Sequence, residues 1–319
     1  MGYGNYSLEA HRALTRKRVA KPLNDVFIRN DCDPEMNPRG VVARECRDST
    51  AHPDSIGIVF ALDVSGSMEA IPHELATATL PTFMEHAMGV VADPQICIMA
   101  FGNAYTDKSA LQVGQFESEA ALIDRWLSAV HLEAGGGGLG ESYGLAMYFA
   151  ARHTSMDCFE KRQKKGYFFM TGDEVTFTHV NRRQVAGLVG DSIESDIAIR
   201  DMVLELQQSF NVFFLIPDQA RADREECGVV WSMLLRERCI VLRDTADAAI
   251  VCALLIGIEE QTLKTRSDLE EHLRSRGLQS AAVARILETV MPFARARAEN
   301  EIAAPGHPGT RTDKPDFGG

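Results

Sequence analysis

The chain has 319 residues and a formal net charge of −12; 45% of its residues are hydrophobic and 24% are charged. This length and hydrophobic content allow one large domain with extensions or two small domains. The negative net charge argues against nonspecific nucleic-acid binding, because such binding depends on Lys and Arg side chains that neutralise phosphates.

The seven cysteines are scattered along the chain and form no Cys-x-x-Cys pair. This usage is typical of the reduced cytosol rather than of a secreted disulfide scaffold. The N-terminal residues lack the apolar core of a signal peptide, and the apolar stretch 248–258 is too short to span a bilayer. The sequence therefore predicts a cytoplasmic protein without a membrane span.

Residues 1–55 are predicted to form a basic N-terminal segment followed by an extended arm. Residues 1–22 indicate a short helix with a basic face. A face exposed to solvent is the favoured interpretation, and a docking site for an anionic partner is the alternative. The basic residues of this face are Arg12, Arg16, Lys17, Arg18 and Lys21. Residues 22–53 are rich in turn-forming residues, and we expect this arm to lie on a folded domain.

The segment 56–68, IGIVFALDVSGSM, carries the strongest structural signal of the chain. Its continuous apolar run predicts a central parallel strand covered on both faces, because an exposed face would require polar residues at alternate positions. Asp63, Ser65 and Ser67 follow just past the carboxyl end of this strand, where open α/β sheets place their binding sites.

Strand-like apolar runs and amphipathic helical segments alternate between residues 56 and 262. The predicted strands lie within 56–62, 96–101, 111–116, 167–170, 212–216 and 239–242. The predicted helices lie within 72–88, 118–130, 141–153, 196–210, 218–236 and 246–263. This alternation predicts one α/β domain, doubly wound around a mostly parallel six-stranded sheet with helices on both faces.

Residues 263–319 are predicted to form a C-terminal helical tail with a disordered end. Segments 267–276 and 279–300 indicate two charged amphipathic helices, the first opening at a cap-like Ser267. Their apolar stripes need a cover, which we expect the domain or a partner to supply. The Pro- and Gly-rich residues 304–319 have little to bury.

Asp63, Ser65 and Ser67 present oxygen donors at alternate positions, and Gly66 permits a tight turn between them. Hard oxygen ligands of this kind suit a small divalent cation such as Mg²⁺. The alternative is that Asp63 and Ser65 only cap the next helix. Because a cap needs one such side chain rather than three, a metal site is the favoured interpretation.

The Asp-x-Ser-x-Ser spacing after a hydrophobic strand resembles the metal-ion-dependent adhesion site of the von Willebrand factor type A (VWA) family. The resemblance covers about residues 56–262 and implies a Rossmann-like VWA fold with a Mg²⁺ or Mn²⁺ ion. It also implies that Ser65 and Ser67 ligate the metal directly, that Asp63 helps directly or through water, and that two later loops supply a Thr and an Asp. One coordination position then remains for a carboxylate of the binding partner.

The resemblance assigns the later acid to residues 167–174, YFFMTGDE. Family members usually have Thr-Asp-Gly at the end of this strand, whereas this chain has Thr171, Gly172 and Asp173. We therefore expect Asp173 to be the acidic ligand, with Glu174 as the alternative. A loop and helix cap is the competing interpretation of this acidic pair.

The family's Gly-Gly-Thr stretch corresponds to residues 134–142, AGGGGLGES, which contain no Thr. Glu141 or Ser142 is expected to replace it, since a carboxylate is an adequate hard ligand. A Glu at this place would add negative charge and change how strongly the metal attracts the carboxylate of a partner.

Two other functions compete with metal-dependent binding. Gly135, Gly137 and Gly140 match the Gly-x-Gly-x-x-Gly dinucleotide fingerprint, but the segment before them is a poor strand. A phosphoester hydrolase could use Asp63 as its nucleophile, but Ser65 stands where haloacid-dehalogenase-like enzymes have their general acid. The chain contains no P-loop motif for ATP hydrolysis.

The sequence thus predicts a bacterial, cytoplasmic VWA protein that is not an enzyme. We expect it to bind Mg²⁺ or Mn²⁺ and, through the metal, an Asp or Glu of a protein partner. Intracellular VWA proteins often act as adaptors for AAA+ ATPases of the MoxR or chelatase type, so the resemblance implies such a partner. The alternative function is a metal-dependent phosphoester hydrolase.

Overall fold

The structure, a computed structural model, describes residues 6–19, 31–68, 79–132 and 140–303, with the backbone alone at Ser67, Glu225 and 301–303. Its centre is a six-stranded sheet with the strand order β10–β9–β6–β2–β3–β4. The strands are β2 (Ser55–Asp63), β3 (Asp93–Phe101), β4 (Leu111–Val113), β6 (Gly166–Thr171), β9 (Phe210–Ile216) and β10 (Cys239–Val241). Only β4 of these six runs antiparallel to its neighbour, so the predicted mostly parallel α/β sheet is confirmed.

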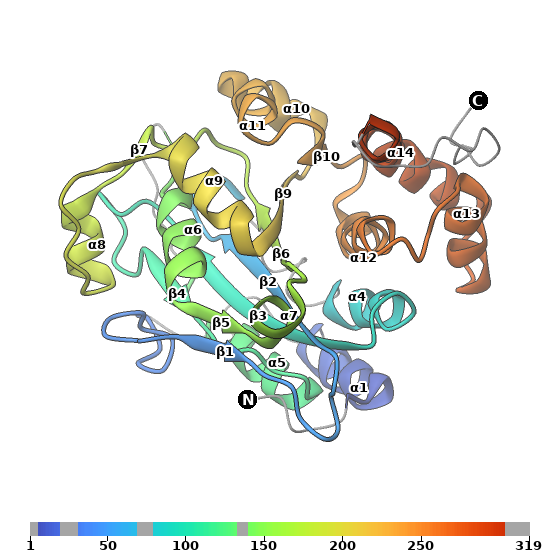
Figure 1. The fold of residues 1–319 in the computed structure, drawn as a ribbon, viewed down its shortest axis with the longest axis horizontal. Coiled ribbons are helices and arrows are strands. Elements are labelled where there is room, and N and C mark those ends of the chain that lie inside the picture. The colour runs from blue at the N-terminus through green and yellow to red at the C-terminus, as the bar shows by residue number, and fades with distance from the viewer. Residues whose placement is uncertain (1–5, 20–30, 69–78, 133–139, 304–319) are drawn as a thin grey trace.

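Helices cover both faces of the sheet (Figure 1). The main ones are α4 (Thr79–Ala87), α5 (Ala120–Ser128), α6 (Tyr143–Arg152), α9 (Ile199–Ser209), α11 (Cys227–Leu235) and α12 (Ala248–Glu259). Side chains of α4, α5 and α12 meet Phe60 and Ile98 of the sheet on one face. On the other face the Tyr143 ring of α6 packs on Phe101, with the ring centroids 4.8 Å apart. None of the helices in the described ranges is long and apolar enough to cross a membrane.

Strand β2 is at the middle of the sheet because its residues are apolar on both faces. Eight of its nine residues are buried, and Phe60 is half-buried. It pairs with β3 along its whole length and with β6 from Ile58 to Leu62. The predicted central position of this segment is therefore confirmed, and Asp63 ends the strand at its carboxyl edge.

Several small elements that the sequence pattern does not predict connect the larger ones. They are β1 (Arg44–Cys46), β5 (Thr154–Met156), β7 (His179–Val180), β8 (Ile197–Ala198), α7 (Asp157–Arg162), α8 (Arg182–Leu188), η1 (Gly66–Met68), η3 (Arg236–Arg238) and η4 (Thr245–Asp247). β1 pairs with β5 and β7 pairs with β8, each as a separate two-stranded sheet. Elements of two to seven residues carry too few periodic positions to be recognised in sequence.

The segment 218–236, predicted as one helix, is broken in the structure. It forms α10 (Gln219–Asp223), the 3₁₀ turn η2 (Arg224–Glu226) and α11. The backbone is extended at Arg224 and left-handed at Glu226, where φ is 59°. Contacts of Arg224 and Trp231 with the end of β6, described below, accompany this break, so tertiary packing overrides the helical pattern.

Helix α1 (Leu8–Val19) confirms the predicted N-terminal helix, but its basic face is only partly solvated. Arg18 is 6% exposed and pairs with Asp124 of α5. Arg12 pairs with Glu85 of α4. The expectation of a solvated basic face is therefore wrong at Arg18, which is buried against an acid of the domain, whereas Arg12 is half exposed.

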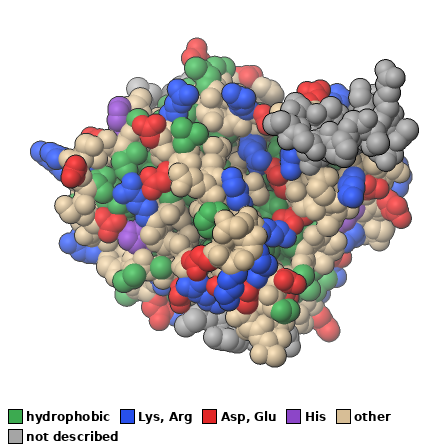
Figure 2. Space-filling view, in the orientation of Figure 1, with side chains coloured by type: hydrophobic (Ala, Val, Ile, Leu, Met, Phe, Trp, Pro, Cys, Tyr) green, Lys and Arg blue, Asp and Glu red, His purple; other side chains and the backbone are tan. Residues whose placement is uncertain are grey.

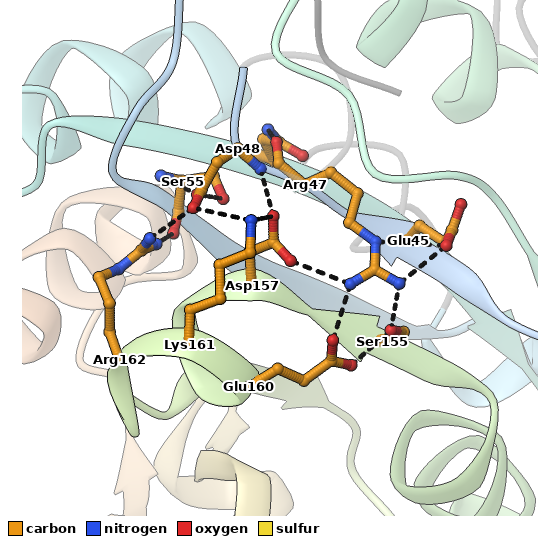
Figure 3. Close-up of polar contacts among 10 residues, drawn as sticks. Glu45, Arg47, Asp48, Ser55, Ser155, Asp157, Glu160, Lys161 and Arg162 are labelled. Atoms are coloured by element: carbon orange, nitrogen blue, oxygen red, sulfur yellow. Dashed lines mark hydrogen bonds and ion pairs between the residues drawn. The ribbon is translucent and has the colours of Figure 1, made fainter. Parts of the chain in front are cut away.

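The arm that precedes β2 packs on the sheet domain, as predicted, through a network of charged side chains (Figure 3). Arg47 Nη1 donates to Asp157 Oδ1 at 3.0 Å and to Glu160 Oε2 at 2.8 Å. The other oxygen of Asp157 accepts from the Asp48 amide at 2.9 Å. Asp48 Oδ2 in turn accepts from Arg162 at 2.7 Å. Asp157 is 4% exposed and is the central acceptor that joins the arm to α7.

We expect Asp157→Ala to lower the free energy of unfolding by about 2 kcal/mol, because it leaves the Asp48 amide without its acceptor and removes one of the carboxylates that Arg47 contacts. The control Arg243→Ala removes an ion pair with Glu288 in which both side chains are more than half exposed. That change should cost less than about 1 kcal/mol. Urea denaturation measures both values, and equal losses would show that the network contributes no more than a surface pair.

Charged side chains of both signs are interspersed over the face of the molecule shown in Figure 2. Basic groups on this face have acidic groups next to them, and hydrophobic side chains form only small patches. A mixed surface of this kind produces no extended field of one sign.

The two predicted tail helices are present as α13 (Arg266–Ser275) and α14 (Ser280–Ala303). α13 begins with a capping box between Thr265 and Asp268, so the predicted cap at Ser267 is wrong by two residues. α14 packs on α12 and α13, and its Phe293 ring meets a Phe ring of β9 with centroids 5.1 Å apart. The tail thus packs on the sheet domain; the disorder predicted for 304–319 lies outside the described residues.

A pair of buried histidines joins α13 to α4. His86 Nδ1 lies 3.2 Å from His272 Nε2, and the two residues are 2% and 7% exposed. Burial lowers the pKa of His86 to about 3, and the charges of His272 and Arg276 act in the same direction. Burial likewise lowers the pKa of His272 to about 4, together with Arg276. Both rings are therefore neutral near pH 7.

We expect the contact between α13 and α4 to weaken as the pH falls below about 6.5. A His whose pKa is depressed by folding takes up its proton preferentially in the unfolded state, so its contribution is full above about pH 6.5 and is lost towards pH 4. Hydrogen exchange of the α13 amides, corrected for the intrinsic rate, should therefore accelerate from about pH 7.5 to about pH 5.

Two variants make this pH test specific to the histidine pair. His272→Gln removes one of the two titrating rings and should reduce the acceleration, whereas His179→Gln changes an exposed side chain and should leave it unchanged. Full protection of α13 at pH 5 in the wild type would contradict the expected role of the pair.

Candidate functional site

The carboxyl ends of β2 and β6 lie side by side, and the residues that follow them approach the start of α6. β2 supplies Asp63, the loop after β6 supplies Asp173, and Glu141 lies just before α6. Glu141 forms a backbone bridge with the loop after β6, where its amide donates to Val175 O at 3.1 Å. Asp63 and Asp173 thus follow neighbouring parallel strands at one edge of the sheet, and the backbone bridge brings Glu141 to the loop that carries Asp173.

Asp63 is fully buried, and hydrogen bonds from within the fold hold both of its oxygens. Oδ1 accepts from the Ser65 amide at 2.9 Å, and Oδ2 accepts from the Tyr143 hydroxyl at 3.0 Å. Burial raises the pKa of Asp63 to about 7, hydrogen bonds from Ser65 and Tyr143 oppose this rise, and the negative charge of Asp173 adds to it. The hydrogen bond from the Ser65 amide to Asp63 is the contact that the capping interpretation predicts. That interpretation does not explain why the carboxylate is fully buried.

Ser65 is 4% exposed and lies beside Asp63. Ser67 falls within η1, where its backbone is described and its side chain is not. The backbone thus turns immediately after Asp63, as the Asp-x-Ser-x-Ser spacing predicts.

Glu141 is 3% exposed, and its Oε2 atom has no hydrogen-bond partner among the described residues. Burial raises the pKa of this carboxyl to about 9, and the negative charges of Asp63, Glu174, Asp107 and Asp173 act in the same direction. A buried oxygen without a partner is costly in a folded protein, and a proton, an ordered water or a bound cation would each relieve this cost.

Ser142, the other residue expected to replace the missing Thr, is engaged within the fold. Its Oγ accepts from the Ala104 amide at 2.9 Å, and its side chain does not cap α6. Asn103, which lies next to Ala104, donates to Gly140 O at 3.0 Å. Loop β3–β4 therefore holds Ser142 in place, whereas Glu141 Oε2 has no partner among the described residues.

Asp173 and Glu174 have different surroundings. Asp173 is fully buried, and its Oδ2 accepts from Arg221 Nε and from Arg224 Nη1, each at 3.2 Å. Glu174 Oε2 accepts from the Gly140 amide at 3.1 Å, which ties the loop after β6 to the loop before α6. The negative charge of Asp173 thus contributes to the raised pKa of Asp63. Glu174 instead joins the two loops.

Tyr143 explains why residue 172 is a glycine. A Cβ atom added to Gly172 would lie 2.2 Å from the Tyr143 hydroxyl oxygen, so a side chain at that place would collide with the ring. The hydroxyl accepts from the Glu174 amide at 3.4 Å while it donates to Asp63. Tyr143 therefore occupies the place that a side chain at residue 172 would need, and the first acid of this loop is Asp173.

Tyr143, Arg221 and Arg224 are the site residues that the sequence analysis missed. Tyr143 directly follows Ser142, and its aromatic ring reads as part of the apolar face of a helix. The arginines belong to the segment predicted as one amphipathic helix, where charged residues indicate a solvated face. No local pattern reveals that they reach a carboxylate 48 and 51 residues earlier.

The donor set of this edge fits a hard divalent cation. Among the described residues no three His, Cys, Asp or Glu side chains are placed to hold a metal by themselves. A site here would instead combine the Ser65 hydroxyl with carboxylate oxygens, as oxygen-ligated Mg²⁺ and Mn²⁺ sites do. The unpartnered Oε2 of Glu141 is the observation that supports this fit.

Fold and site together define a doubly wound α/β protein with a buried acidic cluster at the carboxyl edge of its sheet. No family model and no curated protein matches the chain. The open conformation of the pilus adhesin SpaC from Lactobacillus rhamnosus GG is similar over 68% of this chain and 30% of its own, with 14% identity and a TM-score of 0.43. Proximal thread matrix protein 1 from the mussel byssus is similar over 67% of this chain and 49% of its own, with 10% identity and a TM-score of 0.38. The chain thus spans less than half the length of these solved proteins.

Proposed function

We propose that this protein is a VWA-type binding protein that holds Mg²⁺ or Mn²⁺ at the edge of its sheet and captures a carboxylate of a protein partner through that metal. The observation that carries the proposal is the buried Glu141 oxygen without a partner, beside the fully buried Asp63 and Asp173. The Asp-x-Ser-x-Ser spacing supports the same conclusion independently, because it supplies the hydroxyls that such a site uses.

In this proposal the hydroxyls of Ser65 and Ser67 and the carboxylates of Glu141 and Asp173 hold the ion, and Asp63 helps directly or through water. The metal, when bound, offers an exchangeable position to an outside oxygen. The Tyr143 hydroxyl orients Asp63 from the protein side. A carboxylate is the expected incoming group, because a hard cation prefers a hard anion and a buried carboxylate needs a compensating charge.

We further propose a cytoplasmic, bacterial adaptor that works with an AAA+ ATPase of the MoxR or chelatase type. The scattered cysteines, which form no Cys-x-x-Cys pair, support the compartment. The ATPase partner follows from the resemblance to intracellular VWA proteins, which makes it the most distant part of the proposal.

The phosphoester-hydrolase alternative requires Asp63 to attack a substrate. A nucleophile must reach the reacting atom, but Asp63 is fully buried and both of its oxygens accept hydrogen bonds from Ser65 and Tyr143. No described contact favours that reaction over carboxylate capture.

A pull-down from the native lysate in Mg²⁺ tests the proposed function. Wild type should recover a partner that is lost in EDTA and lost with the double variant Ser65→Ala/Ser67→Ala. The matched control Ser192→Ala/Ser195→Ala changes two exposed serines and should recover the partner as wild type does. Circular dichroism of each variant checks the fold. Recovery of the same partner by the site variant and by chelated wild type would show that the metal does not bridge the interface.

A further inference from the structure

Two arginines place positive charge next to Asp173 of the candidate site. Arg221 Nε and Arg224 Nη1 donate to the same oxygen of Asp173, each at 3.2 Å. Asp173 is fully buried, whereas Arg221 is 18% exposed and Arg224 is 48% exposed. A carboxylate oxygen that already accepts from two guanidinium groups is a weak ligand for another cation.

Both arginines belong to the segment in which the predicted helix is broken. Arg221 is in α10 and Arg224 opens η2, where the backbone is extended. Arg221 also donates to Asp218 at 2.5 Å, so Asp218 and Asp173 share its charge. The two hydrogen bonds to Asp173 therefore come from a short surface segment. Asp218 restrains Arg221, and Arg224 is half exposed to solvent.

We propose that Arg221 and Arg224 form an arginine clamp that competes with the metal for Asp173 and so sets the metal affinity of the site. This inference rests on the proposed metal site. When the ion binds, Asp173 turns from the guanidinium groups to the metal, and the two positive charges, which repel the ion, move away with α10 and η2. While the ion is absent, the two arginines compensate the negative charge of Asp173.

The sign of the effect separates a clamp from a merely structural role. If the arginines only position Asp173 for the metal, removing one of them weakens metal binding. If they compete, removing one tightens it, because the site loses a repelling charge and its ligand becomes available. Asp218→Asn acts in the opposite direction, since it leaves more of the Arg221 charge for Asp173.

Calorimetric titration of the full chain with Mn²⁺ tests the clamp. Arg224→Gln should bind about tenfold more tightly than wild type, and Asp218→Asn should bind more weakly. The control Arg243→Gln removes an exposed partner of Glu288 and should bind as wild type does. Because Arg224 is half exposed, its replacement leaves the core intact, and thermal denaturation in EDTA verifies that each variant is folded.

Hydrogen exchange provides a second readout that does not depend on affinity. Saturating Mn²⁺ should accelerate exchange in the amides of α10 and η2 of the wild type, because Asp173 no longer holds them. If wild type binds Mn²⁺ and Arg224→Gln binds it equally or more weakly, the clamp is refuted and the metal site stands. If neither wild type nor any variant binds Mn²⁺, the proposed function fails, and the clamp fails with it.

Discussion

Asp63→Asn is expected to abolish the stabilisation that Mg²⁺ gives to the wild-type protein. A metal that binds only the folded state stabilises it by about 2.7 kcal/mol at a concentration of 100 Kd, and a variant that cannot bind gains nothing. Asn has nearly the shape of Asp and can still accept from the Ser65 amide, so the change removes charge rather than packing. Asp63→Ala should give the same loss of metal binding.

In EDTA the same variant should be at least as stable as the wild type. Asp63 is a fully buried carboxylate, and the charge of Asp173 opposes its ionisation, so removing its charge relieves repulsion. Thermal denaturation with Mg²⁺ and with EDTA measures both effects, and Asp201→Asn, an exposed acid on α9, is the control. Equal melting shifts with Mg²⁺ in wild type and Asp63→Asn would mean that Asp63 only shapes the turn.

Trp231→Ala is expected to cause the largest loss of stability, about 4 kcal/mol. Trp231 is fully buried, stacks on Phe214 with ring centroids 3.8 Å apart and meets the edge of Tyr143 at 4.9 Å. Its Nε1 donates to Glu174 O at 3.1 Å. The variant thus loses a large aromatic contact and also frees the loop that carries Asp173, so metal affinity should fall with stability.

Trp231→Phe separates the two contributions. It keeps most of the stacking and loses the hydrogen bond to Glu174, so it should cost about 1–2 kcal/mol. Urea denaturation gives the free energies of unfolding, and titration with Mn²⁺ gives the affinities. A loss below about 1 kcal/mol in Trp231→Ala would contradict the role of this ring as the support of the site.

The sheet is predictable from sequence because its strands are buried on both faces. Continuous apolar runs such as 56–62 and 212–216 leave little choice of secondary structure, and alternation with helices leaves few topologies. The antiparallel edge strand β4 carries the weakest apolar run, and its three residues provide little periodicity. Local pattern is therefore sufficient where burial is uniform.

The site is only partly predictable because its geometry depends on contacts between distant residues. The position of Asp63 follows from the strand that ends there, but the choice between Glu141 and Ser142 depends on which side chain loop β3–β4 engages. The break after α10 coincides with contacts of Arg224 and Trp231 with the loop after β6, which no helical periodicity predicts. Arg221 and Arg224 read as solvent-facing charges until the fold brings them to Asp173.

Locating the ion itself tests the metal proposal most directly. Crystals grown with Mn²⁺ and measured near the manganese absorption edge should show an anomalous difference peak at the carboxyl edge of β2 and β6, within about 2.5 Å of oxygens of Ser65 and Glu141. Crystals of Asp63→Asn grown in the same way should show none. Wild-type crystals without a peak at this edge, or with peaks only elsewhere on the surface, would contradict a metal-dependent site in this protein.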